Sequence, residues 1–190
     1  MRMRGSGLVL PAVVSGVMVM SCGCSLLSPS TQSSIEYYDL VRPEKIDSAP
    51  VNVEQFASFS GERHRMIRRK DKTFIRGSDF NKWLQSPGSM LTRYLRIAFR
   101  NGIDDSILKN ADYVAIRGEV LVFEVNDGYA ELGIRYNMQY RKVSLTKTVL
   151  IREKLERRGA EAFSLAMSRA ANRFAKMVAA EANQIKAGRK

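Results

Sequence analysis

Cysteine and histidine are scarce in this chain of 190 residues, which contains two cysteines and one histidine. Two thiols cannot build the disulfide framework of a small secreted scaffold. A structural zinc site takes about four Cys or His ligands, more than the whole chain offers. The sequence also contains no glycine-rich phosphate-binding motif. It therefore gives no pattern for disulfide, metal or nucleotide chemistry.

Long hydrophobic runs are missing as well. The most apolar stretch, LVLPAVVSGVMVM at residues 8–20, is 13 residues long and is interrupted by Pro11 and Gly16. A transmembrane helix needs about 20 apolar residues, so this run is too short to span a bilayer. Arg2 and Arg4 precede it without any acidic residue, which is the layout of a secretory signal. We therefore predict a signal peptide at residues 1–21.

Both cysteines follow this run, two residues apart. Val19-Met20-Ser21-Cys22 resembles a bacterial lipobox, in which the cysteine becomes the first mature residue and carries diacylglycerol and an acyl chain such as palmitate. Cys24 is the alternative, although only a small residue precedes it. Neither cysteine is followed by Asp, which by resemblance to lipoprotein sorting favours the outer membrane. Spare thiols in an ordinary secreted protein are less expected, since an oxidising compartment makes them a liability.

Basic residues outnumber acidic ones, with 31 Lys and Arg against 19 Asp and Glu and a formal net charge of +12. Such a surplus favours anionic partners. Because the signal predicts export, we expect no nucleic acid, and anionic lipid or an acidic protein face remains. Residues 22–34 are Ser-rich and read as a lipidated tether to the folded domain.

The remaining chain, 35–188, predicts a single α+β domain with a mixed or mainly antiparallel sheet packed by two helices. Ser86 followed by Pro87 marks the start of a helix, and apolar residues recur every three to four positions from Phe163. The turn at 126–128 joins two strands, the second of which alternates strictly. The expected helices are 87–101 and 160–186, and the expected strands are 36–41, 49–56, 64–69, 72–77, 112–125, 129–141 and 144–153, the last three forming a meander.

A basic stretch is the most distinctive surface feature of the sequence. Charges at a strand edge can block pairing with other strands. They can also contact anionic headgroups, each adding about 1 kcal/mol near an acidic surface. Both interpretations stay open, although the spacing favours several cations on one side. The candidate contact residues are Arg63, Arg65, Arg68, Arg69, Lys70, Lys72 and Arg76.

The chain contains one histidine, His64, and one tryptophan, Trp83. A histidine-dependent catalytic site would have to use His64, but no nucleophile motif surrounds it, so we expect an exposed strand residue and no catalytic residues. We expect Trp83 to anchor the core below the first helix together with Phe80 and Leu84.

Several short motifs, taken in order, resemble one family. The set covers nearly the whole mature chain and resembles the ABC-type transport auxiliary lipoproteins, the family of paraquat-inducible protein C. The chain departs from the family pattern at Ile67, where an aromatic residue is common. The matching segments are Cys22 with Ser25-Leu26-Leu27, Tyr37-Tyr38-Asp39-Leu40, Val51-Asn52-Val53 with Phe56, Arg65-Met66-Ile67-Arg68, Phe80 with Trp83, Pro87 with Met90-Leu91, and Gly118 with Val122-Phe123-Glu124.

The resemblance implies a periplasmic lipoprotein that works beside an inner-membrane ABC permease and ATPase and a mammalian-cell-entry-type protein that moves lipids. It implies anchoring and docking, no enzymatic activity, and no cofactor other than the covalent lipid. Whether the chain forms a homo-oligomer stays open. Two alternatives are an assembly or pilot lipoprotein of a secretion or outer-membrane machine, and an envelope hydrolase that would depend on His64.

Overall fold

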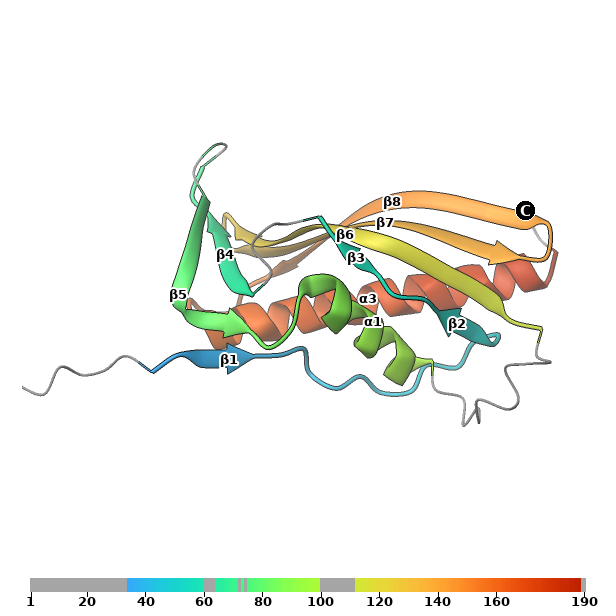
Figure 1. Cartoon of the computed structure of the whole chain (residues 1–190), viewed down its shortest axis with the longest axis horizontal. Coiled ribbons are helices and arrows are strands. Elements are labelled where there is room, and N and C mark those ends of the chain that lie inside the picture. Colours follow the sequence, from blue (N-terminus) through green and yellow to red (C-terminus); the bar gives the residue numbers. More distant parts are fainter. Residues whose placement is uncertain (1–33, 60–63, 72, 74, 100–111, 189–190) are drawn as a thin grey trace, which may run out of the picture. The chain divides into compact units, whose positions relative to one another are not determined.

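Three long antiparallel strands form the centre of the computed structural model, which describes residues 34–59, 64–71, 73, 75–99 and 112–188 (Figure 1). They are β6 (Val114–Asn126), β7 (Tyr129–Tyr140) and β8 (Val143–Lys154), and they confirm the predicted meander. Asp127 and Gly128 at the first hairpin have φ of 46° and 77°, as a two-residue type I′ turn requires.

Three short strands run one after another along the other edge of β6. They are β2 (Val51–Val53), β3 (Ala57–Ser58) and β4 (Arg65–Arg69), and all pair with β6 in parallel. β5 (Ile75–Trp83) returns antiparallel to β4, and β1 (Glu36–Tyr38) pairs with β5 in parallel. The result is a mixed sheet, as predicted, but it has eight strands where the sequence predicts seven. The predicted strand 49–56 corresponds to β2 alone, β3 follows it as a separate strand, and β5 extends to Trp83, beyond the predicted end at residue 77.

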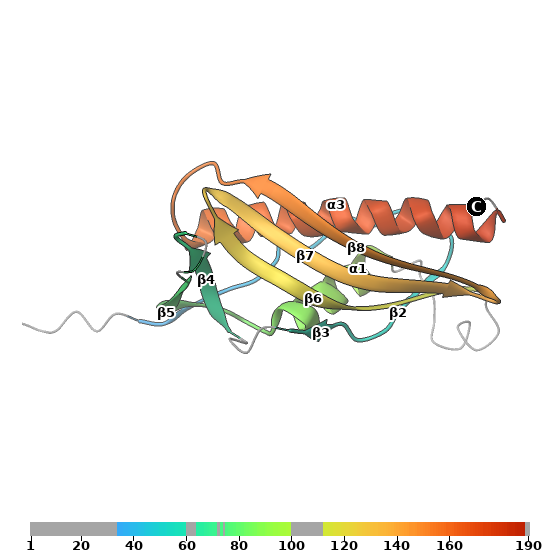
Figure 2. The ribbon, with the colours of Figure 1, turned by 90° about the horizontal axis from the view of Figure 1, so that it is seen from above.

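Both helices cover one side of the long strands, α1 (Pro87–Ala98) near β2 and β3, and α3 (Ala160–Lys186) along β7 and β8 (Figures 1 and 2). The hydroxyl oxygen of Ser86 accepts a hydrogen bond from the N–H of Ser89, which confirms the predicted helix start. The helix ends at Ala98, before the predicted residue 101, which lies outside the described residues. α3 has the predicted bounds. None of the helices among the described residues is long and apolar enough to span a membrane.

The core lies between the helices and the sheet. The six alternating residues of β7, from Ala130 to Tyr140, are all buried, which confirms the predicted face. The indole of Trp83 packs edge-on against the rings of Phe123 and Phe163, with both centroid distances 5.0 Å. Trp83 is therefore the core anchor that the sequence predicts.

The prediction that Phe80 and Leu84 share this role is wrong, because their side chains are 52% and 49% exposed. Phe80 lies three residues before Trp83 on β5, an odd spacing that strand alternation places on the opposite face. Leu84 follows the last residue of β5 and lies in the bend between the strand and α1, not in the strand that carries Trp83.

The start of α1 lies directly against the backbone of the segment between β2 and β3. The Gly88 N–H donates a hydrogen bond to the Ser58 hydroxyl oxygen at 2.8 Å. The hydroxyl of Thr92 accepts from the Phe56 N–H at 2.9 Å and donates to the Gly88 carbonyl at 2.7 Å. A side chain at residue 88 would occupy the space in which these backbones meet, so a glycine stands there.

Candidate functional site

The predicted basic stretch lies on the β4–β5 hairpin, and its described members point to two faces. Arg65 forms an ion pair with Asp79 at 3.2 Å, and Arg69 contacts Glu124 on the sheet face that the helices leave uncovered. Arg68 instead lines a cleft between the hairpin and α3. The stretch therefore does not form one row of cations. Lys70 follows β4 and is exposed, whereas Arg63 and Lys72 lie outside the described residues.

Two cations of the hairpin line the cleft beneath it. Arg68 and Arg76 are register partners across β4 and β5, and neither guanidinium makes an ion pair or hydrogen bond with a described residue. Asp79 also lines the cleft and pairs with Arg65. Like charges directly opposite each other destabilise a strand pair. The cleft has a volume of about 370 Å³, and Met66 and Phe163 form part of its apolar wall. Two cations beside apolar side chains can receive an anionic group with an apolar part.

A row of four charged side chains crosses the uncovered face of the sheet. Glu124 and Glu131 are direct partners on β6 and β7, and both are buried. Arg69 donates to Glu124 at 2.5 Å and 3.1 Å, and Arg152 of β8 lies 2.9 Å from Glu131. The hydrogen bond to Glu124 raises the pKa of the Arg69 guanidinium. Each carboxylate is thus paired with its own arginine. These ion pairs link β4 to β6 and β7 to β8, so we assign the four side chains to stabilising the sheet.

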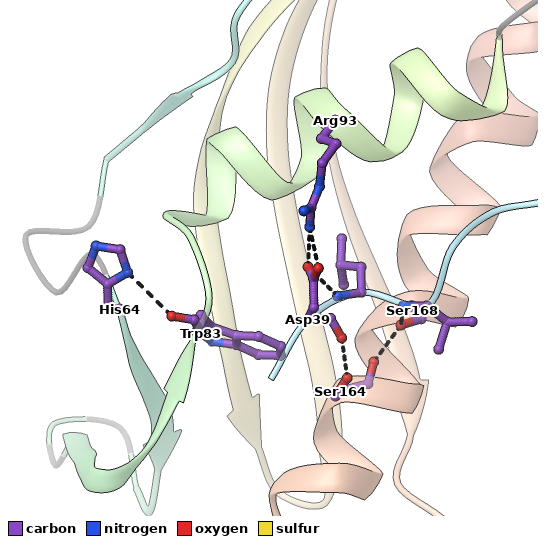
Figure 3. Close-up of polar contacts among 8 residues, drawn as sticks. Asp39, His64, Trp83, Arg93, Ser164 and Ser168 are labelled. Atoms are coloured by element: carbon purple, nitrogen blue, oxygen red, sulfur yellow. Dashed lines mark hydrogen bonds and ion pairs between the residues drawn. The ribbon is translucent and has the colours of Figure 1, made fainter. Parts of the chain in front are cut away.

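The extended segment that follows β1, residues 39–46, lies against both helices, and we call it the strap. The Arg93 guanidinium of α1 holds the Asp39 carboxylate through contacts to both oxygens. The Ser164 hydroxyl of α3 donates to the Asp39 carbonyl oxygen at 2.5 Å (Figure 3). One strap residue is therefore tied to two helices.

Two further hydrogen bonds hold the strap in place. The Val41 N–H donates to the Ser168 hydroxyl oxygen at 2.9 Å, and the Ile46 N–H donates to the Ala98 carbonyl at 2.9 Å. The sequence predicts a strand over 36–41, whereas β1 ends at Tyr38 and the strap follows it. The strap's only local signal is Ser164 and Ser168, two hydroxyls spaced by four residues within an otherwise Ala-rich apolar stripe.

His64 lies apart from these serines and from Asp39 in Figure 3. Its Nδ1 lies 3.3 Å from the Trp83 carbonyl oxygen. Among the described residues, no hydroxyl or carboxylate forms a hydrogen bond with the imidazole. Within the same residues no group of three His, Cys, Asp or Glu side chains is placed to hold a metal ion. Cys22 and Cys24 lie outside the described residues.

Comparison with known proteins yields similarity at the level of the fold. No family model and no curated protein matches the chain. The structure is similar to the crystal structure of an uncharacterized protein, with a TM-score of 0.64 and 14% identity, covering 78% of this chain and 98% of that one. It is also similar to a Xanthomonas campestris protein described by the family model DUF330, with a TM-score of 0.55 and 16% identity, covering 77% of this chain and 93% of that one. At these identities the likeness shows the shared fold alone.

Proposed function

We propose that this chain is a lipid-anchored periplasmic auxiliary component of an ABC and mammalian-cell-entry-type lipid-transport system, and that it acts by anchoring and docking. The lipobox-like Cys22 and the family resemblance support this role. The structural observation that carries it is the pair Arg68 and Arg76, which line an open cleft and have no carboxylate partner among the described residues, while the Asp79 carboxylate in the same cleft pairs with Arg65. Such a pair is suited to anionic headgroups or to an acidic face of a transport protein.

The shared fold supports the proposal without identifying a partner. The uncharacterized protein and the DUF330 protein align with about three quarters of this chain, and the alignment covers nearly all of each. The shared fold thus extends over nearly all of each of those chains. The function itself rests on the site and the anchor.

Affinity purification tests the proposal directly. The tagged full chain, solubilised in detergent from its own cells, should retain an ABC ATPase, a permease or a mammalian-cell-entry-domain protein, identified by mass spectrometry. An untagged strain is the control. Recovery of only secretion or outer-membrane assembly proteins would instead support the pilot-lipoprotein alternative and overturn the transport role.

Lipidation is predicted to depend on Cys22. Metabolic labelling with a palmitate analogue should label the wild-type chain and the Cys24→Ser variant, whereas Cys22→Ser should lose the label and leave the membrane fraction. The reason is that the lipidated cysteine supplies the acyl chains that hold the chain at a membrane. If the label persists in Cys22→Ser and disappears in Cys24→Ser, the lipidated residue is Cys24 and the prediction for Cys22 is wrong.

We predict that the pair Arg68 and Arg76 lowers the stability of the β4–β5 hairpin and strengthens binding to anionic vesicles. Replacing Arg68 and Arg76 together by glutamine should stabilise the hairpin by about 0.5 kcal/mol, because like charges no longer face each other. The same variant should bind phosphatidylglycerol vesicles about tenfold more weakly in a flotation assay, since two headgroup contacts are lost.

The matched control is Lys142 and Arg158 replaced together by glutamine, which lowers the net charge equally on exposed residues elsewhere. If both double variants weaken vesicle binding to the same extent, total charge explains the binding and the pair has no special role.

A further inference from the structure

A groove runs between the strap and α3, beside the hydrogen bond that joins Val41 to Ser168, and both of these residues line it. Its volume is about 410 Å³, within the usual range of small-ligand sites, and it is open to solvent. Because Val41 and Ile46 are held by hydrogen bonds at the two ends of the strap, the walls of the groove are fixed by the fold.

Apolar side chains form one part of this groove. Val41 of the strap and Leu165 of α3 both line it and are 53% and 38% exposed. Pro43 adds to the same wall. Because these residues come from two elements and meet in one concave place, an apolar chain laid along the groove would cover all three.

Tyr94 of α1 supplies a hydroxyl donor to the groove. Its side chain lines the groove and is 5% exposed, and its hydroxyl makes no hydrogen bond with any residue that the structure describes. The hydroxyl oxygen is not one of the fully buried polar atoms that lack a partner, so it can reach solvent in the groove. Burial of the ring raises the pKa of Tyr94 to about 12, so the hydroxyl stays protonated and can donate to a ligand oxygen.

The charges around the groove are mainly positive. Arg42 and Lys176 line it, and within the described residues neither has a carboxylate partner. Arg169 also lines it and lies 3.2 Å from Glu156, so its charge is largely compensated. Glu44 also lines the groove and has no basic partner among the described residues, so the unpaired cations Arg42 and Lys176 exceed the unpaired acidic charge by one. This positive surplus beside a hydroxyl donor favours a ligand that carries a negative group with several acceptor oxygens.

We propose that the groove binds one anionic phospholipid, with an acyl chain along Val41 and Leu165 and the phosphate near Lys176 and the Tyr94 hydroxyl. The apolar wall, the cations and the unpaired donor each match one part of such a lipid. The inference deepens the proposed function and rests on it for the source of the lipid, since a transport component would meet phospholipids at a membrane.

Photo-crosslinking of the full chain provides the test. The chain purified from its envelope is inserted into phosphatidylcholine vesicles that contain phosphatidylglycerol with a diazirine in the acyl chain, and cross-linked peptides are mapped by mass spectrometry. We expect cross-links in the strap and in residues 165–176. Lys176→Glu should lower their yield about tenfold, since a cation is replaced by an anion at the phosphate site. Tyr94→Phe should lower it severalfold through loss of one donor without loss of packing.

The matched control is Arg173→Glu, the same charge reversal on an exposed residue of α3 that does not line the groove. It should leave the yield unchanged, and diazirine-labelled phosphatidylcholine should give a lower yield than phosphatidylglycerol. Equal yields for Lys176→Glu and Arg173→Glu would overturn the proposal. So would complete competition by free glycerol phosphate, which would indicate a plain phosphate site.

The purification of partners tests the transport role, and the cross-linking experiment tests the lipid site, so either proposal can be overturned without the other. Lipid in the groove with no transport proteins recovered would remove the transport role and keep the site. Transport proteins recovered with no lipid in the groove would do the reverse.

Discussion

Replacing Gly88 by alanine is expected to destabilise the domain by about 3 kcal/mol, at the upper end for overpacking. Alanine normally favours a helix over glycine by about 1 kcal/mol, so local propensity predicts the opposite sign. The reason is contact with backbone: a Cβ at residue 88 would lie 2.4 Å from the Phe56 carbonyl oxygen and 2.7 Å from that of Ala57. Neither carbonyl can move without displacing β3 or α1.

Urea unfolding followed by the fluorescence of Trp83, the only tryptophan, measures this loss. Gly77→Ala is the matched control. Its Cβ would come within 2.9 Å of the Arg65 side chain, which is flexible and can move aside, so its effect should stay within about 0.5 kcal/mol. If Gly88→Ala were as stable as Gly77→Ala, the close approach of α1 to the β2–β3 segment would be wrong.

Arg69→Met should cost about 2 kcal/mol of unfolding free energy. Removing one partner of a buried ion pair costs roughly 3–5 kcal/mol, and the value is smaller here because the Arg69 side chain is 27% exposed. The variant leaves Glu124 buried beside Glu131 with no arginine of its own, so two carboxylates share the charge of Arg152. The same urea titration measures the change.

A second substitution separates the loss of the pair from the loss of packing. Adding Glu124→Leu to Arg69→Met should recover most of the stability, because replacing both partners of a buried pair by apolar groups is often near neutral. Arg157→Met, which removes an exposed pair with Glu161, should change stability by less than about 0.5 kcal/mol. A double variant no more stable than Arg69→Met would show that the charge row does not act as described.

Local patterns in the sequence were sufficient for the C-terminal half of the fold. The alternation in β7 and the period of α3 reflect burial of one face, and each is complete within a single element. The Ser86 cap likewise depends only on neighbouring residues. These features are determined by short-range chemistry, so a single sequence contains them.

The N-terminal half and the site depend on distant partners. β3 has two residues, too few for a pattern, and exists because it pairs with Glu119 and Val120 of β6. The strap has no regular structure of its own and is placed by Arg93, Ser164 and Ser168. The groove needs residues from three segments, so no motif in one segment indicates it.

The parallel pairing of β2, β3 and β4 with β6 determines the order in which parts of the chain can fold. In parallel pairs such as Val51 with Val114, the strand near the N-terminus has no partner until residues 114–126 are present. The meander and α3 use contacts between neighbouring elements, which form with less loss of chain entropy. If the chain is exported from its N-terminus, as proposed, residues 36–69 emerge first but complete their pairing last, once β6 has arrived.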